Sequence, residues 1–208
     1  MKNKRVIIVE GCDRTGKSTF ISILSKKIAE AGKQPFVFHL ASPAKFNNIT
    51  FNNDEKSLMQ LSRFDTQYEL VMQILDQNKN AIIILDRAHY GEYVWAKYWN
   101  RIGKYFEHTC DALYAKYEKL FKHAVYIDYY IEDLNLLESR ILESQEDIDI
   151  FTINNKTIKE NIKTVYDLYN DVCQMIYKKY YVPIEQFNNI NDLHAVEIFA
   201  NTIMHQYV

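Results

Sequence analysis

The residues with the clearest chemical potential lie near the start of the chain, at positions 11–18. They fit the pattern G-x-x-x-x-G-K-[ST] at every fixed position. Gly11 and Gly16 can adopt positive φ angles, which turn successive backbone N–H groups toward an anion. Lys17 supplies a mobile charge for the β- and γ-phosphates of a nucleotide, and the Ser18 hydroxyl can bind Mg²⁺. We therefore expect a nucleotide-phosphate site formed by Gly11, Cys12, Asp13, Arg14, Thr15, Gly16, Lys17, Ser18 and Thr19.

The segments on either side of this loop predict the strand and helix that must hold it. Residues 5–10 contain a short apolar run rich in β-branched residues, which predicts a buried strand. Phe20, Leu24 and Ile28 recur every four residues and predict a helix over about 16–31. The positive end of this helix dipole would face the bound phosphates.

Strands and helices alternate along the rest of the chain. Further strands are expected at 35–40, 81–85, 124–130 and 182–187, and helices at 54–78, 89–99, 111–122, 134–142, about 156–180 and 193–206. Five apolar strands separated by helices predict an α/β fold whose parallel sheet is covered on both faces. Because no repeat, low-complexity tract or linker interrupts the chain, we expect a single domain over 1–208.

Composition agrees with a compact globular enzyme. Of 208 residues, 48% are hydrophobic and 25% are charged. The net charge of −2 supplies no global basic field for nucleic acid, so a nucleic-acid partner is not expected. No apolar run is long enough for a bilayer, so no membrane association is expected. Cys12, Cys110 and Cys173 match no zinc or disulfide spacing, which favours a cytoplasmic location.

A parallel sheet also predicts where a ligand binds, because its ligands lie outside the carboxyl ends of the strands at a topological switch point. Three groups fall there: the glycine loop after the first strand, the Pro-Ala-Lys loop 43–45 after the second, and Asp86-Arg87 after the third. We expect the three to meet in one site.

Residues 9–19 resemble the form of this loop found in thymidylate kinases and related nucleoside and nucleotide kinases, in which Asp-Arg precedes x-Gly-Lys-Ser-Thr. The resemblance implies a three-layer P-loop NTPase fold with a five-stranded parallel sheet, and it implies ATP and Mg²⁺ as cofactors. It also implies that Asp13 approaches the 3′-hydroxyl of the acceptor and that Arg14 stabilises the transferring phosphoryl group. The family is commonly dimeric, so a homodimer is one expected assembly. A Gly-Glu-Tyr-Val stretch at 91–94 is similar to stretches in viral members.

The resemblance extends to the other two groups at this edge. Asp86-Arg87 is similar to the family's Asp-Arg pair, whose Arg holds the acceptor phosphate and whose Asp lies near the metal and reacting phosphates. Lys45 stands where the family has an Arg that meets the same phosphate. A lysine keeps the charge but loses the bidentate geometry.

The resemblance places the nucleobase pocket on the helix before Asp86. Arg63, Phe64 and Gln67, with Tyr68, are the candidates. Phe64 is equally explained by core packing, and Arg63 by a solvated helix surface. Tyr90 and Glu92 are candidates to face the acceptor sugar.

A short polar lid is expected at about 143–155, in the place of the family's lid over ATP. It carries Glu143, Glu146, Asp147 and Asp149 but no Arg. Arg140, just before it, resembles a lid-base Arg that packs on adenine, and a helix-surface role is an equal alternative. The cation at the γ-phosphoryl would then come from Arg14 rather than from the lid.

The resemblance implies an ATP- and Mg²⁺-dependent kinase acting on a deoxynucleoside monophosphate, with dTMP or a modified relative as the first candidate. Arg14, Lys17 and Asp86 would be its catalytic residues. Three alternatives stay open: a deoxynucleoside kinase with Glu10 or Asp86 as base, a kinase of hydroxymethylated bases in DNA, and a nucleotide-binding regulator with weak ATPase activity. The two cations Arg14 and Arg87 argue against the last.

Overall fold

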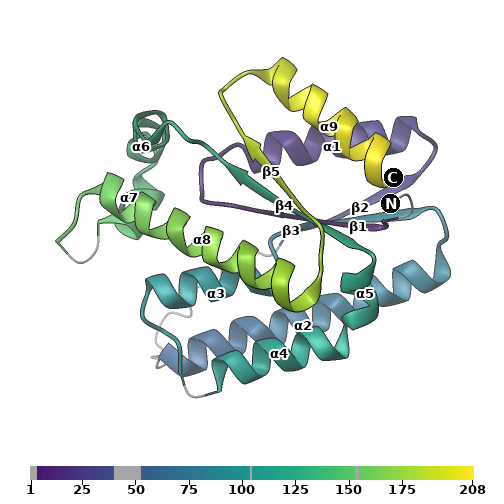
Figure 1. Cartoon of the computed structure of the whole chain (residues 1–208), viewed down its shortest axis with the longest axis horizontal. Coiled ribbons are helices and arrows are strands. Elements are labelled where there is room, and N and C mark those ends of the chain that lie inside the picture. Colours follow the sequence, from purple (N-terminus) through teal and green to yellow (C-terminus); the bar gives the residue numbers. More distant parts are fainter. Residues whose placement is uncertain (1–3, 40–52, 104, 153–154) are drawn as a thin grey trace.

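The computed structural model describes residues 4–39, 53–103, 105–152 and 155–208. Its centre is one parallel sheet in the strand order β2-β3-β1-β4-β5 (Figure 1). The strands are β1 (Val6–Glu10), β2 (Gln34–His39), β3 (Ala81–Asp86), β4 (Ala124–Tyr130) and β5 (Ile184–Asn188). The predicted five-stranded parallel sheet is therefore confirmed, and β1 is its central strand because it pairs with β3 on one side and β4 on the other.

Helices cover both faces of this sheet, as predicted (Figure 1). The helices are α1 (Lys17–Glu30), α2 (Asn53–Gln77), α3 (His89–Tyr98), α4 (Phe106–Lys116), α5 (Glu118–Lys122), α6 (Leu134–Leu142), α7 (Gln145–Phe151), α8 (Ile158–Tyr180) and α9 (Leu193–Tyr207). α1 and α9 lie together on one face, while α2, α3 and α8 lie on the other.

Two hydrophobic cores follow from the alternation of side chains along β1. Successive residues of a strand point to opposite faces of the sheet. Ile7 and Val9 therefore pack against α1 and α9, whereas Val6 and Ile8 pack toward α2, α3 and α8. Because all four side chains are fully buried, the apolar run that predicted this strand is explained by burial on both faces.

Two predicted segments differ from the structure. The single helix expected over 111–122 is two helices, α4 and α5, separated at Tyr117. The backbone of Tyr117 leaves the helical region (φ −111°, ψ 24°), and its hydroxyl donates to Asp65 and Glu69 of α2. The polar segment 143–155 contains the helix α7, because Phe151 is buried against Trp95 and Tyr98.

Across the described ranges, the helices are too short or too polar to span a lipid bilayer.

Candidate active site

Two glycines shape the loop between β1 and α1. Gly11 has φ 139°, and a Cβ placed on it would lie 2.0 Å from the Tyr129 carbonyl oxygen. Gly16 has φ 97°, and its Cβ would lie 2.6 Å from the Asn189 Nδ2. Both positions therefore favour glycine for the backbone angle, and at Gly11 the close approach of the Tyr129 backbone is a second reason. The loop in this shape leads directly into the N-terminus of α1, as an anion site requires.

Lys17 folds back over this loop. Its side chain is largely buried, and Nζ donates to the carbonyl oxygens of Cys12 at 2.6 Å and Gly11 at 3.1 Å. Burial lowers the pKa of Lys17, and the nearby charge of Arg87 lowers it further. Cys12 is also buried, and burial raises the pKa of its thiol to about 12, so it is no nucleophile.

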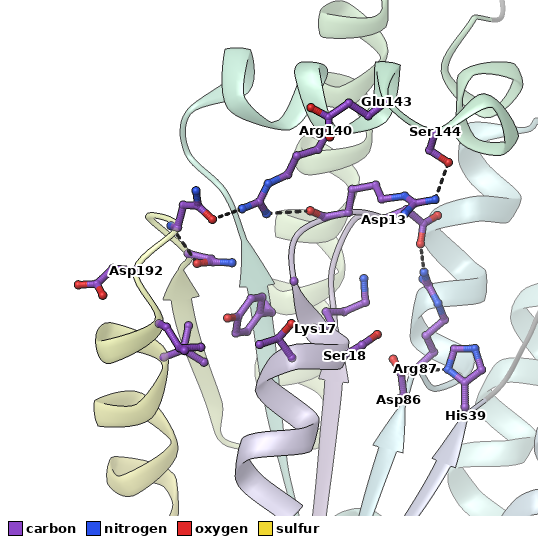
Figure 2. A pocket seen from close by; sticks show the side chains of 18 residues that line it. Asp13, Lys17, Ser18, His39, Asp86, Arg87, Arg140, Glu143, Ser144 and Asp192 are labelled. Carbon is purple, nitrogen blue, oxygen red and sulfur yellow. Dashed lines mark hydrogen bonds and ion pairs between the residues drawn. The ribbon is translucent and has the colours of Figure 1, made fainter.

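Contacts from two other segments brace the loop. Asn189, after β5, donates from Nδ2 to the Thr15 carbonyl oxygen at 2.7 Å. Arg140 of α6 donates from Nη1 to the Arg14 carbonyl oxygen at 3.1 Å and from Nη2 to Asn191 (Figure 2). Arg140 thus lies beside the loop, and its packing on an adenine stays a prediction. Sequence reasoning missed Asn189 and Asn191, because isolated asparagines in a polar loop carry no pattern.

On the other side of the loop, Arg87 forms an ion pair with Asp13 (Figure 2). Burial acts to raise the pKa of Asp13, but Arg87 and Lys17 outweigh it and the pKa is lowered. Arg87 likewise keeps a raised pKa despite burial, mainly because of Asp13. Its Nη1 is buried and has no hydrogen-bond partner among the described residues. A buried guanidinium nitrogen of this kind is suited to a second anion.

The residues expected to hold a metal ion lie at the mouth of the loop. Asp86 is buried at the end of β3, and its Oδ2 contacts His39 Nδ1 at 2.6 Å. Its Oδ1 is buried without a partner in the described parts of the chain, and the exposed Ser18 opens into the same cavity. Those parts contain no cluster of three or more His, Cys, Asp or Glu side chains. The arrangement fits Mg²⁺, which binds through one or two protein oxygens together with substrate phosphates and water.

Most of these groups border one cavity of about 780 Å³ (Figure 2), but Gly11, Cys12 and Thr15 of the loop are not among the described residues that line it. Its volume is within the range of nucleotide-sized sites. One end is formed by residues after β5 and between α6 and α7, and the other by residues at the ends of β2 and β3. The lining residues include Asp13, Arg14, Lys17, Ser18, Thr19, His39, Asp86, Arg87, Tyr129, Arg140, Ser144, Asn189, Asn191 and Val196.

Comparison with solved structures places this arrangement in a known fold. The chain is similar to a thymidylate kinase from Ehrlichia chaffeensis (TM-score 0.60, 13% identity, 98% of this chain and 100% of that chain covered). It is also similar to the YorR protein of Bacillus subtilis, crystallised with phosphorylated GDP (TM-score 0.59, 19% identity, 96% and 94% covered). The chain shares the P-loop NTPase fold of these structures, a five-stranded parallel sheet with helices around it. No protein-family model matches the sequence, and no curated protein matches it.

The residues expected to hold the acceptor lie in two separate places: Asp13 and Arg87 line the cavity, whereas the candidates on α2 and α3 do not. Phe64 packs in the core beside Tyr68 and His89, and Tyr90 packs against His89 with ring centroids 4.0 Å apart. Arg63 is half-buried on α2 and donates to Gln60, and Gln67 on the same helix carries a buried Oε1. Among the residues that the structure describes, none of these four candidates lines the 780 Å³ cavity. Lys45 lies outside the described residues.

Tyr169 of α8 is a candidate that sequence reasoning missed. Its ring is buried, and its hydroxyl has no partner in the described ranges. Burial raises the pKa of Tyr169, the charge of Glu10 raises it further, and the charge of Arg87 acts to lower it. In the sequence, Tyr169 is one more apolar contact of a long amphipathic helix, so its type and spacing carry no functional signal.

Proposed function

We propose that this chain is a kinase that transfers the γ-phosphoryl group of ATP to the phosphate of a deoxynucleoside monophosphate, with dTMP or a modified relative as the first substrate to test. The observation that carries the proposal is the placement of two buried cations. Lys17 covers the loop that would hold the donor phosphates, and Arg87 lies across from it with an unpartnered Nη1. Two separate cations suit a reaction between two phosphate groups.

The residues of this site would act through position and charge. The backbone N–H groups of the loop and the Lys17 ammonium would hold the donor phosphates, and the Arg87 guanidinium would hold the acceptor phosphate. Mg²⁺, held by Ser18 and Asp86, would neutralise the charge on the β- and γ-phosphates. Because an acceptor phosphate is already ionised, no strong general base is needed, and alignment with electrostatic stabilisation would supply the rate enhancement.

Two further observations support this proposal. The solved structures of similar fold include a thymidylate kinase and one that contains phosphorylated GDP. The cysteines Cys12, Cys110 and Cys173 are free thiols, all buried, which supports the proposed cytoplasmic setting of a single-domain enzyme.

The deciding experiment measures ADP release from ATP and Mg²⁺ with deoxynucleoside monophosphates, deoxynucleosides and single-stranded oligonucleotides as acceptors. The proposal expects a monophosphate to be the best substrate by kcat/KM. Lys17→Ala is the control, because any rate that survives in this variant comes from a contaminating kinase. A better rate with a nucleoside or an oligonucleotide would overturn the proposal, as would ADP release that no acceptor increases.

A further inference from the structure

Glu10 is a buried carboxylate that the proposed reaction does not use. It is the last residue of β1, and its side chain is fully buried beside the start of α3. Its Oε1 accepts hydrogen bonds from the backbone N–H of Ala88 at 2.5 Å and of Gly91 at 3.2 Å. A carboxylate at this point also faces the positive end of the α3 dipole. The central strand is thereby tied to the turn that joins β3 to α3.

Arg87 occupies that turn in an unusual conformation. Its φ angle is 82°, in the left-handed region that residues other than glycine, asparagine and aspartate seldom adopt. Its own N–H donates to the Val9 carbonyl oxygen at 3.0 Å, and the next N–H, that of Ala88, donates to Glu10. Two consecutive residues of β1 thus hold both N–H groups of the turn. Such a conformation persists only where its surroundings hold it, and here it directs the guanidinium toward Asp13.

Gly91 gives independent evidence that the Glu10 carboxylate packs tightly against the start of α3. A Cβ on Gly91 would lie 2.4 Å from Oε2, 2.5 Å from Oε1 and 2.7 Å from Cδ of Glu10. Gly91 lies inside α3, where glycine is less favourable than alanine. Its φ angle is not positive, so the backbone does not require a glycine here. The requirement comes from the carboxylate of Glu10.

The electrostatics of the site show that a buried carboxylate is unfavourable here. Burial raises the pKa of Glu10 to about 7, whereas Arg87 and the Ala88 N–H act to lower it. Lys17 also lowers it, and Asp86 raises it. Glu10 therefore contacts the turn that carries Arg87 even though burial disfavours its charged form.

We propose that Glu10 is a positioning residue for Arg87: it fixes the Arg87–Ala88 turn through the two N–H groups, and Gly91 leaves the space for its carboxylate. This inference rests on the proposed function, in which Arg87 binds the acceptor phosphate. In this role Glu10 does not touch the reacting atoms and is therefore not a general base.

The test compares steady-state constants for acceptor and ATP in Glu10→Ala, Gly91→Ala, the double variant and Glu10→Gln. Glu10→Ala and Gly91→Ala should each raise the acceptor KM by about tenfold or more and leave the ATP KM within about twofold. Glu10→Gln keeps a carbonyl oxygen for the N–H groups and should stay near the wild type. In the double variant the clash partner is gone, so Gly91→Ala should add no further defect to Glu10→Ala.

Asp128→Ala is the matched control. Asp128 is the register partner of Glu10 on β4 and is also buried, but its carboxylate accepts from Gln186 rather than from the α3 turn. It should leave the acceptor KM unchanged. A defect seen only in Glu10→Ala then comes from the lost contact with the α3 turn and not from the loss of a buried carboxylate as such. Thermal unfolding of each variant confirms that it is folded, and Gly91→Ala tests the same contact if Glu10→Ala does not fold.

The outcomes separate this inference from the function on which it rests. If Arg87→Ala raises the acceptor KM while folded Glu10→Ala and Gly91→Ala leave it unchanged, Glu10 does not position Arg87. A Gly91→Ala defect that adds fully to that of Glu10→Ala would also overturn the inference. If Arg87→Ala itself leaves the acceptor KM unchanged, the assignment of Arg87 to the acceptor fails.

Discussion

The guanidinium of Arg87 donates to the carboxylate of Asp13 and so joins the end of β3 to the phosphate-binding loop. Both side chains are mostly removed from solvent, with 19% and 26% of their surface exposed. A partly buried charge pair holds its geometry more firmly than one in free solvent. The two residues proposed to meet the acceptor therefore form one unit, with one guanidinium nitrogen occupied by Asp13 and Nη1 left for the phosphate.

Substitution of Arg87 should weaken acceptor binding selectively. Arg87→Ala removes a charge-assisted contact, and we expect a loss on the order of 2–3 kcal/mol, or roughly 30- to 160-fold in acceptor KM. Arg87→Lys should recover only part of this loss, because an ammonium cannot contact Asp13 and a phosphate in the same fork geometry. The ATP KM, measured in the same assays, is the internal control. Equal effects on both substrates would show that Arg87 supports the loop as a whole rather than the acceptor.

Removal of the Lys17 charge should stop turnover. In the structure the ammonium lies against the Cys12 and Gly11 carbonyl oxygens, within reach of bound phosphates. Lys17→Met keeps most of the length and removes the charge, and we expect kcat to fall by at least about a thousandfold. Lys26→Ala is the matched control, since Lys26 is an exposed lysine of the same helix. Activity of Lys17→Met within a few-fold of the wild type would contradict the assignment.

The parts of the site that sequence reasoning located are those determined by neighbouring residues. Gly11, Gly16 and Lys17 are recognisable because the turn, the anion nest and the helix start all lie within eight positions. The inner strands β1, β3 and β4 were recognisable because burial on both faces requires continuous apolar runs. Asp86 and Arg87 could be placed in the site because the carboxyl ends of parallel strands share one edge.

The parts that sequence reasoning could not locate depend on contacts between distant segments. Asn189 reaches Thr15 across 174 positions, and Arg140 reaches the Arg14 carbonyl across 126. The break at Tyr117 arises from hydrogen bonds to α2, not from a helix-breaking residue. Gly91 illustrates the same limit, because only the structure shows that the Glu10 carboxylate occupies the space of its missing side chain.

The stability of the protein should depend on pH through His89. Burial lowers the pKa of His89 to about 3, against an ordinary value of 6.5. Between these two pH values the unfolded chain binds a proton at His89 and the folded chain does not. The contribution of His89 to the free energy of unfolding is therefore complete above pH 6.5 and is lost progressively as the pH falls below it. Between these two pKa values, the contribution of His89 to the free energy of unfolding should fall by about 1.4 kcal/mol for each pH unit.

His89→Gln removes this titration and can still bond to the Tyr68 hydroxyl, which lies 2.9 Å from His89 Nδ1. Urea denaturation of the wild type and of His89→Gln at pH 7.5, 6.5 and 5.5 gives the free energy of unfolding of each, and the difference between the two, wild type minus variant, should fall as the pH falls. Glu10 and Glu92, whose pKa values burial raises to about 7, titrate in both proteins and cancel in that difference. Stability curves that stay parallel over this range would show that His89 is not held neutral.

Arg14 lies where the proposed transfer would need an additional positive charge. It is exposed on the loop with φ 62°, and its guanidinium donates to the Ser144 hydroxyl at the start of the lid (Figure 2). Residues 143–155 contain no arginine, so the lid sequence offers no cation of this type for the γ-phosphoryl group. An arginine supplied to such a site contributes roughly 10³–10⁵ in rate. We propose that Arg14 is that arginine.

Arg14→Ala should therefore lower kcat by at least about a hundredfold and change ATP binding little, because the contact would be strongest in the transition state. Arg14→Lys should restore only part of the rate, since an ammonium lacks the planar fork. Ser144→Ala is the control for the tether between loop and lid: it removes the hydroxyl that Arg14 contacts and keeps the guanidinium, so its kcat should stay far above that of Arg14→Ala. Steady-state kinetics and calorimetric ATP titration decide between the roles. A near-normal kcat in Arg14→Ala, or a defect confined to ATP affinity, would show that Arg14 binds the ground state and that the catalytic cation comes from another residue.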